Sequence, residues 1–69
     1  MRANRKKVEL AMARACMSIS HIASKSGLPE PTVKNVIYGK GVKPVTLGKF
    51  AAAIGVDPAE IIKEEQNDN

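Results

Sequence analysis

The sequence predicts an all-α fold, a compact bundle of five short helices. Two observations support this prediction. Glycine and proline residues divide the 69-residue chain into five short segments. In each segment the apolar residues follow the three-to-four-residue spacing of a helix and not the alternation of a strand. A chain of this length has room for one domain, which we place at residues 1–65, followed by a polar tail at 66–69.

The first predicted helix runs from about Asn4 to Met17. Its apolar stripe consists of Val8, Ala11, Met12, Ala15 and Cys16. We expect Cys16 to be a small core residue. The second predicted helix runs from Ile19 to Ser26, with Ser18 as its N-cap, and ends at Gly27, because glycine readily takes the left-handed conformation found just past a helix end.

The third predicted helix begins within residues 29–31 and ends at Gly39. Two prolines fit there, because the amides of a first helical turn have no intrahelical partners to lose. Residues 40–44 are predicted to form a loop, and a fourth helix is predicted from Val45 to Ile54, before Gly55.

The fifth predicted helix opens with a capping acid, Asp57, then Pro58 and a glutamate, Glu60, placed to reach back to the cap amide. Ile61 and Ile62 supply its apolar side. The residues that we expect in the core of the whole bundle are Ile22, Val33, Ile37, Leu47, Phe50, Ile54 and Ile61.

Charge is distributed unevenly along the chain. Residues 1–49 hold ten Lys and Arg against two acids, a net charge of +8, whereas residues 50–69 hold one Lys against five acids, a net charge of −4. One part of the molecule therefore attracts polyanions. Nucleic acid is the leading candidate partner and an anionic membrane surface comes second, while ordinary solvated lysines remain the simplest alternative.

Several other functions find no support in the sequence. One Cys and one His allow neither an internal disulfide nor a four-ligand zinc site. Ser20 and His21 are neighbours on one helix and do not face each other, so we expect no catalytic pair and an exposed His21. No apolar run reaches the ~20 residues of a membrane span. We expect a soluble, cytoplasmic protein that is no enzyme and has no cofactor, metal, membrane or small-molecule substrate as a partner.

The joint between the second and third segments is Ser26-Gly27-Leu28-Pro29. Two helices joined by so short a turn containing Gly form a helix-turn-helix unit. From Met17 to Ile62 the chain resembles the helix-turn-helix family of phage repressors and Cro proteins. The positions that carry the resemblance are Ile22, Ala23, Gly27, Leu28, Thr32, Val33, Gly39, Lys40, Pro44, Leu47, Phe50, Ala51, Ala53, Ile54, Gly55, Val56 and Ile61.

The resemblance implies that the third helix enters the major groove of DNA and that its first residues face base edges. The base-contacting positions would be Glu30, Pro31, Lys34 and Asn35. Asn35 suits a two-bond contact with adenine, and Lys34 suits guanine or a phosphate. A solvated surface amide is the alternative at Asn35, and stabilisation of the helix dipole is the alternative at Glu30.

The resemblance also implies contacts to the DNA backbone. The positions assigned to phosphate contacts are Ser18, Ser20, Thr32, Lys40, Lys43, Arg5 and Lys6. For the loop lysines the alternative is an ordinary solvated loop. For the basic N-terminus we leave two interpretations open, a phosphate-contacting arm or first turn and a disordered start. Ile19 departs from the family, which often has a phosphate-binding Gln at this position.

The main hypothesis is a sequence-specific DNA-binding transcriptional regulator of phage or mobile-element type, acting in the cytoplasm of a bacterial host cell on a double-stranded operator. A homodimer on DNA is one possible assembly, because a single helix-turn-helix covers one half-site. The residues assigned to a dimer or partner surface are Phe50, Val56, Ile61 and Ile62. The alternative is an antirepressor or modulator that binds a repressor protein, because Ile19, Glu30 and Pro31 depart from the DNA-binding pattern. An antitoxin-like partner is a further possibility.

Overall fold

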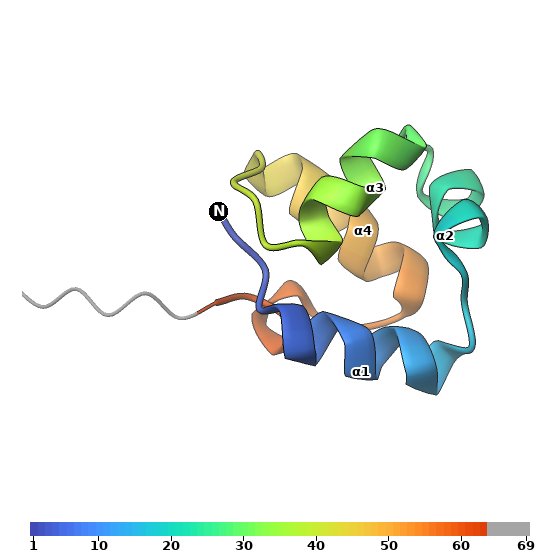
Figure 1. Cartoon of the computed structure of the whole chain (residues 1–69), viewed down its shortest axis with the longest axis horizontal. Helices are drawn as coiled ribbons and strands as arrows, with labels where there is room; N and C mark the ends of the chain where they lie inside the picture. The colour runs from blue at the N-terminus through green and yellow to red at the C-terminus, as the bar shows by residue number, and fades with distance from the viewer. Residues whose placement is uncertain (64–69) are drawn as a thin grey trace, which may run out of the picture.

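The structure, a computed structural model, describes residues 1–63 of the chain (Figure 1). Within them it has four α-helices, α1 (Arg5–Ala15), α2 (Ile19–Ser26), α3 (Glu30–Ile37) and α4 (Pro44–Ile54), and one short 3-10 helix, η1 (Pro58–Glu60). The all-α prediction is confirmed, whereas the prediction of five helices is wrong by one. The proposed domain boundary at residue 65 and the polar tail at 66–69 lie outside the described residues.

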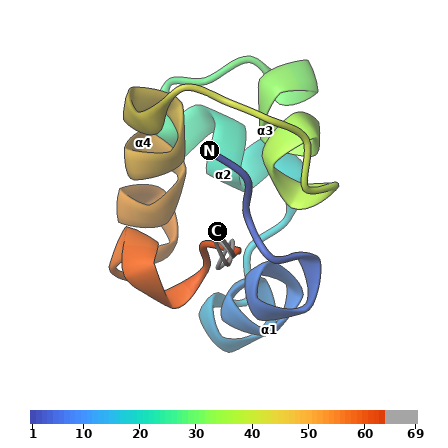
Figure 2. The same ribbon diagram turned by 90° about the vertical axis from the view of Figure 1, so that its left-hand side faces the viewer.

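The helices surround one apolar core. α2 packs on α3 and α4, α1 crosses beneath α3 and α4, and η1 packs against α4 (Figures 1 and 2). All seven residues predicted for the core are buried, and Phe50 is the largest fully buried side chain. No helix within residues 1–63 is long and apolar enough to cross a membrane.

The helix ends follow the predicted signals closely. Asn4 caps α1 by accepting a hydrogen bond from the Lys7 amide (3.0 Å), and Ser18 caps α2 by accepting from the His21 amide (3.2 Å). α2 has the predicted bounds, and α4 starts one residue earlier than predicted, at Pro44. α3 ends at Ile37, and Gly39, with φ +78°, turns the chain away from it.

The end of α1 corrects one prediction. The helix stops at Ala15, and Cys16 takes the left-handed conformation, with φ 55°. Its side chain is exposed and does not enter the core. The apolar stripe of α1 therefore ends one residue earlier than predicted, with Ala15 packed against the core.

The fifth predicted helix is a single 3-10 turn. Its N-terminus has the predicted capping box, in which Asp57 accepts from the Ala59 amide (2.8 Å) and Glu60 accepts from the Asp57 amide (3.3 Å). The chain then becomes extended, because its backbone groups pair with the N-terminal segment. The Ile61 carbonyl accepts from the Asn4 amide (2.7 Å), and the Lys63 amide donates to the Arg2 carbonyl (2.9 Å).

Residues 1–4 are a structural part of the fold. Ala3 is buried and forms an antiparallel bridge with Ile62. On its other side the segment exchanges two backbone hydrogen bonds with Val42, which donates to the Met1 carbonyl (2.7 Å) and accepts from the Met1 nitrogen (3.0 Å). The interpretation of the basic N-terminus as a disordered start is therefore wrong, and its contact with phosphates stays a prediction.

Candidate nucleic-acid interface

The turn between α2 and α3 is closed by local hydrogen bonds. Gly27 has φ +76°, and its amide donates to the Ala23 carbonyl (3.0 Å). Ser26 Oγ donates to the same carbonyl (3.4 Å) and accepts from the Leu28 amide (3.1 Å). Because Leu28 also packs against the core, the turn fixes the direction in which α3 leaves α2. This arrangement is a helix-turn-helix.

The buried face of α3 determines which of its residues face outward. Val33, Val36 and Ile37 lie in the core. The opposite face carries residues at positions i, i+3, i+4 and i+7, namely Pro31, Lys34, Asn35 and Tyr38. We call these four residues the α3 outer stripe. Pro31, Lys34 and Tyr38 are exposed and Asn35 is half-buried.

Three of the four predicted base-contacting residues lie in the α3 outer stripe, and the fourth, Glu30, is exposed one turn before Lys34. Asn35 has no side-chain hydrogen bond to another residue within 1–63, so its amide can both donate and accept. Glu30 is the first residue of α3, where a carboxylate stabilises the helix dipole whether or not it also meets a base. Thr32 is half-buried, and its amide donates to the Pro29 carbonyl (3.0 Å).

Tyr38 was missed by the sequence analysis. Its side chain is 50% exposed, and the Arg5 guanidinium lies over its ring, 5.3 Å from the centroid. Arg5 also pairs with Glu9 at 3.4 Å, the one ion pair found within residues 1–63. The signal was available in the sequence, because residues 31, 34, 35 and 38 already have the spacing of one helix face.

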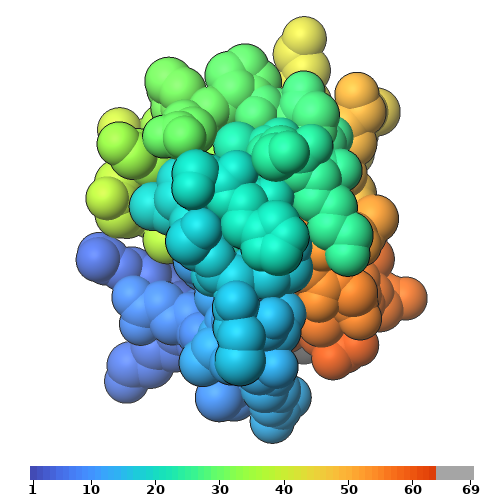
Figure 3. Space-filling model, turned by 90° about the vertical axis from the view of Figure 1, so that its right-hand side faces the viewer, coloured from blue at the N-terminus to red at the C-terminus, as the bar shows by residue number. Residues whose placement is uncertain are grey.

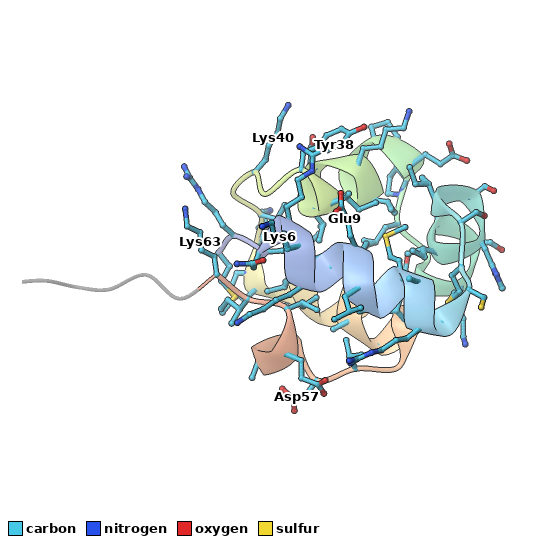
Figure 4. All side chains as sticks on the ribbon, turned by 60° about the horizontal axis from the view of Figure 1, so that its bottom comes forward. Lys6, Glu9, Tyr38, Lys40, Asp57 and Lys63 are labelled. Carbon is cyan, nitrogen blue, oxygen red and sulfur yellow. The ribbon has the colours of Figure 1, made fainter. Side chains whose placement is uncertain are left out.

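The predicted phosphate contacts come from three other segments. Lys40 and Lys43 are exposed on the loop between α3 and α4, and Arg5 and Lys6 are exposed in the first turn of α1. Figure 4 shows Lys6, Lys40 and Lys63 toward the left of the view and Tyr38 above Lys6, whereas Asp57 lies at the lower edge. The fold thus brings basic residues from distant parts of the sequence to the end of the molecule where α3 terminates.

The first turn of α2 supplies further polar groups. Ser18 and Ser20 are both exposed, with their hydroxyl oxygens 3.4 Å apart. Within residues 1–63, the Ile19 and Ser20 amides have no hydrogen-bond acceptor, as expected at the start of a helix. In the view toward α2, its outer surface faces solvent between α3, α1 and α4 (Figure 3). These amides and hydroxyls are the donors that an anion could meet there.

The predicted dimer surface is only partly available. Phe50 and Ile61 are completely buried, so neither can meet a partner in this conformation. Val56 and Ile62 are half-buried and pack against the core. Leu10, which is 53% exposed, borders an open groove together with Val56. His21 is exposed, as predicted.

The side chains of this surface can bind a ligand through hydrogen bonds and charge. Within the described residues no group of three or more His, Cys, Asp or Glu side chains is placed to hold a metal ion. The polar groups of the α3 outer stripe and of the basic residues near it lie at the surface. Such a surface binds by hydrogen bonds and charge along an extended ligand.

Fold and surface together define a helix-turn-helix DNA-binding domain. The family model that matches the sequence is the Cro/C1-type HTH DNA-binding domain, which matches residues 7–67. The chain belongs to this family, so the resemblance to phage repressors and Cro proteins is confirmed at the level of the family. No significant match was found among curated proteins or among solved structures. The family supports a DNA-binding regulator whose ligand is double-stranded DNA.

Proposed function

We propose that this chain is a sequence-specific transcriptional regulator of the phage repressor and Cro type, which inserts α3 into the major groove of an operator. The observation that carries the proposal is the α3 outer stripe, which presents Lys34 and Asn35 on the face turned away from the core. In helix-turn-helix proteins this is the face that meets base edges.

The base contacts that we propose follow from the chemistry of each side chain. Asn35 donates to adenine N7 and accepts from the adenine N6 amino group in a two-bond pair, and Lys34 donates to guanine or to a phosphate. Glu30 accepts from a cytosine amino group, and Pro31 contacts a thymine methyl. A good two-bond pair discriminates against the wrong base by about 1–3 kcal/mol.

The backbone contacts that we propose surround the reading helix. Lys40 and Lys43 follow α3, Arg5 and Lys6 begin α1, and the two hydroxyls of Ser18 and Ser20 flank the first amides of α2. Thr32 is the remaining candidate, beside the DNA backbone. If five phosphates are neutralised per subunit, the logarithm of the binding constant falls with the logarithm of salt concentration with a slope of about −4.5.

We further propose that two copies bind one operator. A single helix-turn-helix of this type covers one half-site, and pairing on half-sites ~34 Å apart raises affinity. With Phe50 and Ile61 in the core, the partner surface of the proposal is reduced to Val56 and Ile62.

The antirepressor alternative loses part of its motivation. Ile19 is half-buried and packs against the core, so its apolar side chain has a packing role. The alternative then depends on Glu30 and Pro31 alone, and both residues also fit the first turn of a helix. It predicts a stable complex with a repressor and little affinity for DNA.

The test is fluorescence anisotropy of the purified chain with a randomised duplex pool at 50 and 200 mM salt, followed by sequencing of the bound fraction. Steeply salt-dependent binding with enrichment of a two-fold-symmetric sequence is expected. Equal recovery of all sequences would contradict base recognition. No binding at 50 mM salt would overturn the proposal for the free chain and favour the repressor-binding alternative.

A further inference from the structure

A shallow depression lies beside the C-terminal end of α3. It has a volume of about 350 Å³ and is bordered by Asn4, Arg5, Lys6, Tyr38, Gly39 and Lys63. We call it the Tyr38 depression. Its residues come from the start of α1, the end of α3 and the extended segment after η1. The backbone hydrogen bond from Lys63 to Arg2 (2.9 Å) ties the last of these segments to the residues just before α1.

The Tyr38 depression is strongly basic. Among the described residues that border it, three side chains are cations and none is a carboxylate. Within residues 1–63, Glu9 pairs with Arg5 Nε at 3.4 Å on the exposed surface of α1. Within residues 1–63, Lys6, Lys63 and the Tyr38 hydroxyl make no side-chain hydrogen bond or ion pair. The depression therefore presents positive charge and a hydroxyl donor together.

Tyr38 connects this depression to the α3 outer stripe. It is the last member of that stripe and borders the depression as well. The Arg5 guanidinium over its ring holds the tyrosine beside the start of α1. In Figure 4, Lys6 and Lys63 lie on the same side of the view as Lys40, and Tyr38 lies above Lys6. A duplex seated along α3 would thus bring its sugar-phosphate backbone past this end.

We propose that the Tyr38 depression binds one phosphodiester group of the DNA backbone, just beyond the base pairs that α3 reads. The Tyr38 hydroxyl and the Lys6 and Lys63 ammonium groups donate to its oxygens, and Arg5 supports the tyrosine ring while adding positive charge. This inference rests on the proposed function and adds Tyr38 and Lys63 to its contacts. It extends the protein's footprint on one flank of each half-site.

Lys6 and Lys7 provide a matched pair for the test. They are neighbours in the first turn of α1, and both are exposed. Lys6 borders the Tyr38 depression, whereas Lys7 borders the groove between α1 and η1. Lys6→Gln and Lys7→Gln therefore remove the same charge from the same helical turn but from different surfaces.

The experiment measures duplex affinity against salt for the full chain and for Lys6→Gln, Lys7→Gln and Tyr38→Phe. We expect Lys6→Gln to reduce the magnitude of the log–log salt slope by about 0.9 and Lys7→Gln to leave it unchanged. Tyr38→Phe removes a hydrogen bond to a charged group, so we expect about a tenfold loss of affinity with the same slope.

A second measurement locates the phosphate. Duplexes carrying one uncharged methylphosphonate at each backbone position in turn are expected to weaken wild-type binding at one flanking position. A methylphosphonate at that position should not weaken binding by Lys6→Gln any further, and it should still weaken binding by Lys7→Gln. Identical behaviour of the two lysine variants, with Tyr38→Phe at wild-type affinity, would overturn the inference while leaving the proposed function intact.

Two controls distinguish failure of the proposed function from binding of free phosphate in the Tyr38 depression. No salt-dependent duplex binding by the wild-type chain would overturn the proposed function, and this inference with it. Inorganic phosphate titrated at constant ionic strength tests a free anion as the ligand. Saturable NMR shifts at Arg5 and Tyr38 in that titration, without any Lys6→Gln effect on DNA binding, would assign the depression to free phosphate and overturn the DNA contact.

Discussion

Asn35 is the residue whose side chain best suits base recognition, because its amide has no partner within residues 1–63 and lies in the α3 outer stripe. We expect Asn35→Ala to weaken binding to the preferred operator by about 1–3 kcal/mol and to abolish the preference at one base pair. Affinity for random duplex should change little. Competition anisotropy with the preferred and the random duplex measures both effects.

Lys40→Gln is the control for that prediction. Lys40 is exposed on the loop after α3, where a phosphate contact carries no sequence information. Its loss should weaken binding to both duplexes equally and reduce the magnitude of the salt slope by about 0.9. If Asn35→Ala also weakens both duplexes equally, Asn35 does not read a base.

Cys16 has an unfavourable backbone conformation for a residue with a Cβ. Its φ of 55° belongs to the left-handed region, which costs a non-glycine residue about 1–2 kcal/mol. Because the side chain is exposed, its removal loses little packing. We expect Cys16→Gly to raise the free energy of unfolding by about 1 kcal/mol, measured by urea denaturation under reducing conditions.

Ala13→Gly is the comparison for Cys16→Gly. Ala13 is exposed inside α1, where glycine costs about 1 kcal/mol relative to alanine. The two glycine substitutions, three residues apart, should therefore shift stability in opposite directions. A loss of stability in both would mean that the left-handed cap conformation is not strained at Cys16.

At the scale of elements, the turn between α2 and α3 depends on Gly27. An added Cβ would meet no atom within 4 Å, so the cost of a side chain there comes from its φ of +76° alone. We expect Gly27→Ala to lower the free energy of unfolding by about 1–2 kcal/mol. Urea denaturation followed by circular dichroism at the helical signal measures it.

Gly48 is the comparison for Gly27, because alanine is expected to stabilise the protein at this position. It lies inside α4, and a Cβ there would also meet no atom within 4 Å. We expect Gly48→Ala to raise the free energy of unfolding by about 0.5–1 kcal/mol, because alanine is the better helix former. Equal effects of the two alanine substitutions would contradict the assignment of Gly27 to a conformational role.

At the scale of the whole molecule, the N-terminal segment closes the fold. Ala3 is buried between the residues after η1 and the turn at Gly39. The turn is so close that a Cβ added at Gly39 would lie 3.3 Å from the Ala3 carbonyl oxygen. We expect Ala3→Gln to lower the free energy of unfolding by about 2–4 kcal/mol, because it both overpacks the site and buries an amide. The measurement is the urea midpoint at constant slope.

Ala13→Gln tests whether the substitution itself is harmful. Ala13 is exposed on α1, so the same change should shift stability by no more than about 0.5 kcal/mol. A similar small effect of Ala3→Gln would show that residues 1–4 are dispensable. The pairing of the N-terminal segment with Val42 and Ile61 would then contribute little to the fold.

The sequence by itself determined the elements that depend on neighbouring residues. Cap side chains, prolines in first turns and the glycine at position 27 act within a few residues, so they predicted α2 and the boundaries of α4 to within one residue. Periodic burial likewise predicted the seven core residues, because a helix face repeats every three to four residues. The same periodicity places Lys34 and Asn35 on the outer face of α3.

Only the tertiary structure decided the features that join distant segments. The fifth helix stops after one turn because residues 61–63 pair with residues 2–4. No pattern in the neighbouring sequence predicts this pairing. The same pairing puts Ala3 in the core and brings Arg5 over Tyr38. The sequence assigned Phe50 and Ile61 both to the core and to the partner surface, and their complete burial in the folded chain leaves them only the first role. These contacts join residues that are far apart in the sequence. The spacing of residue types along the chain does not indicate which distant segments meet.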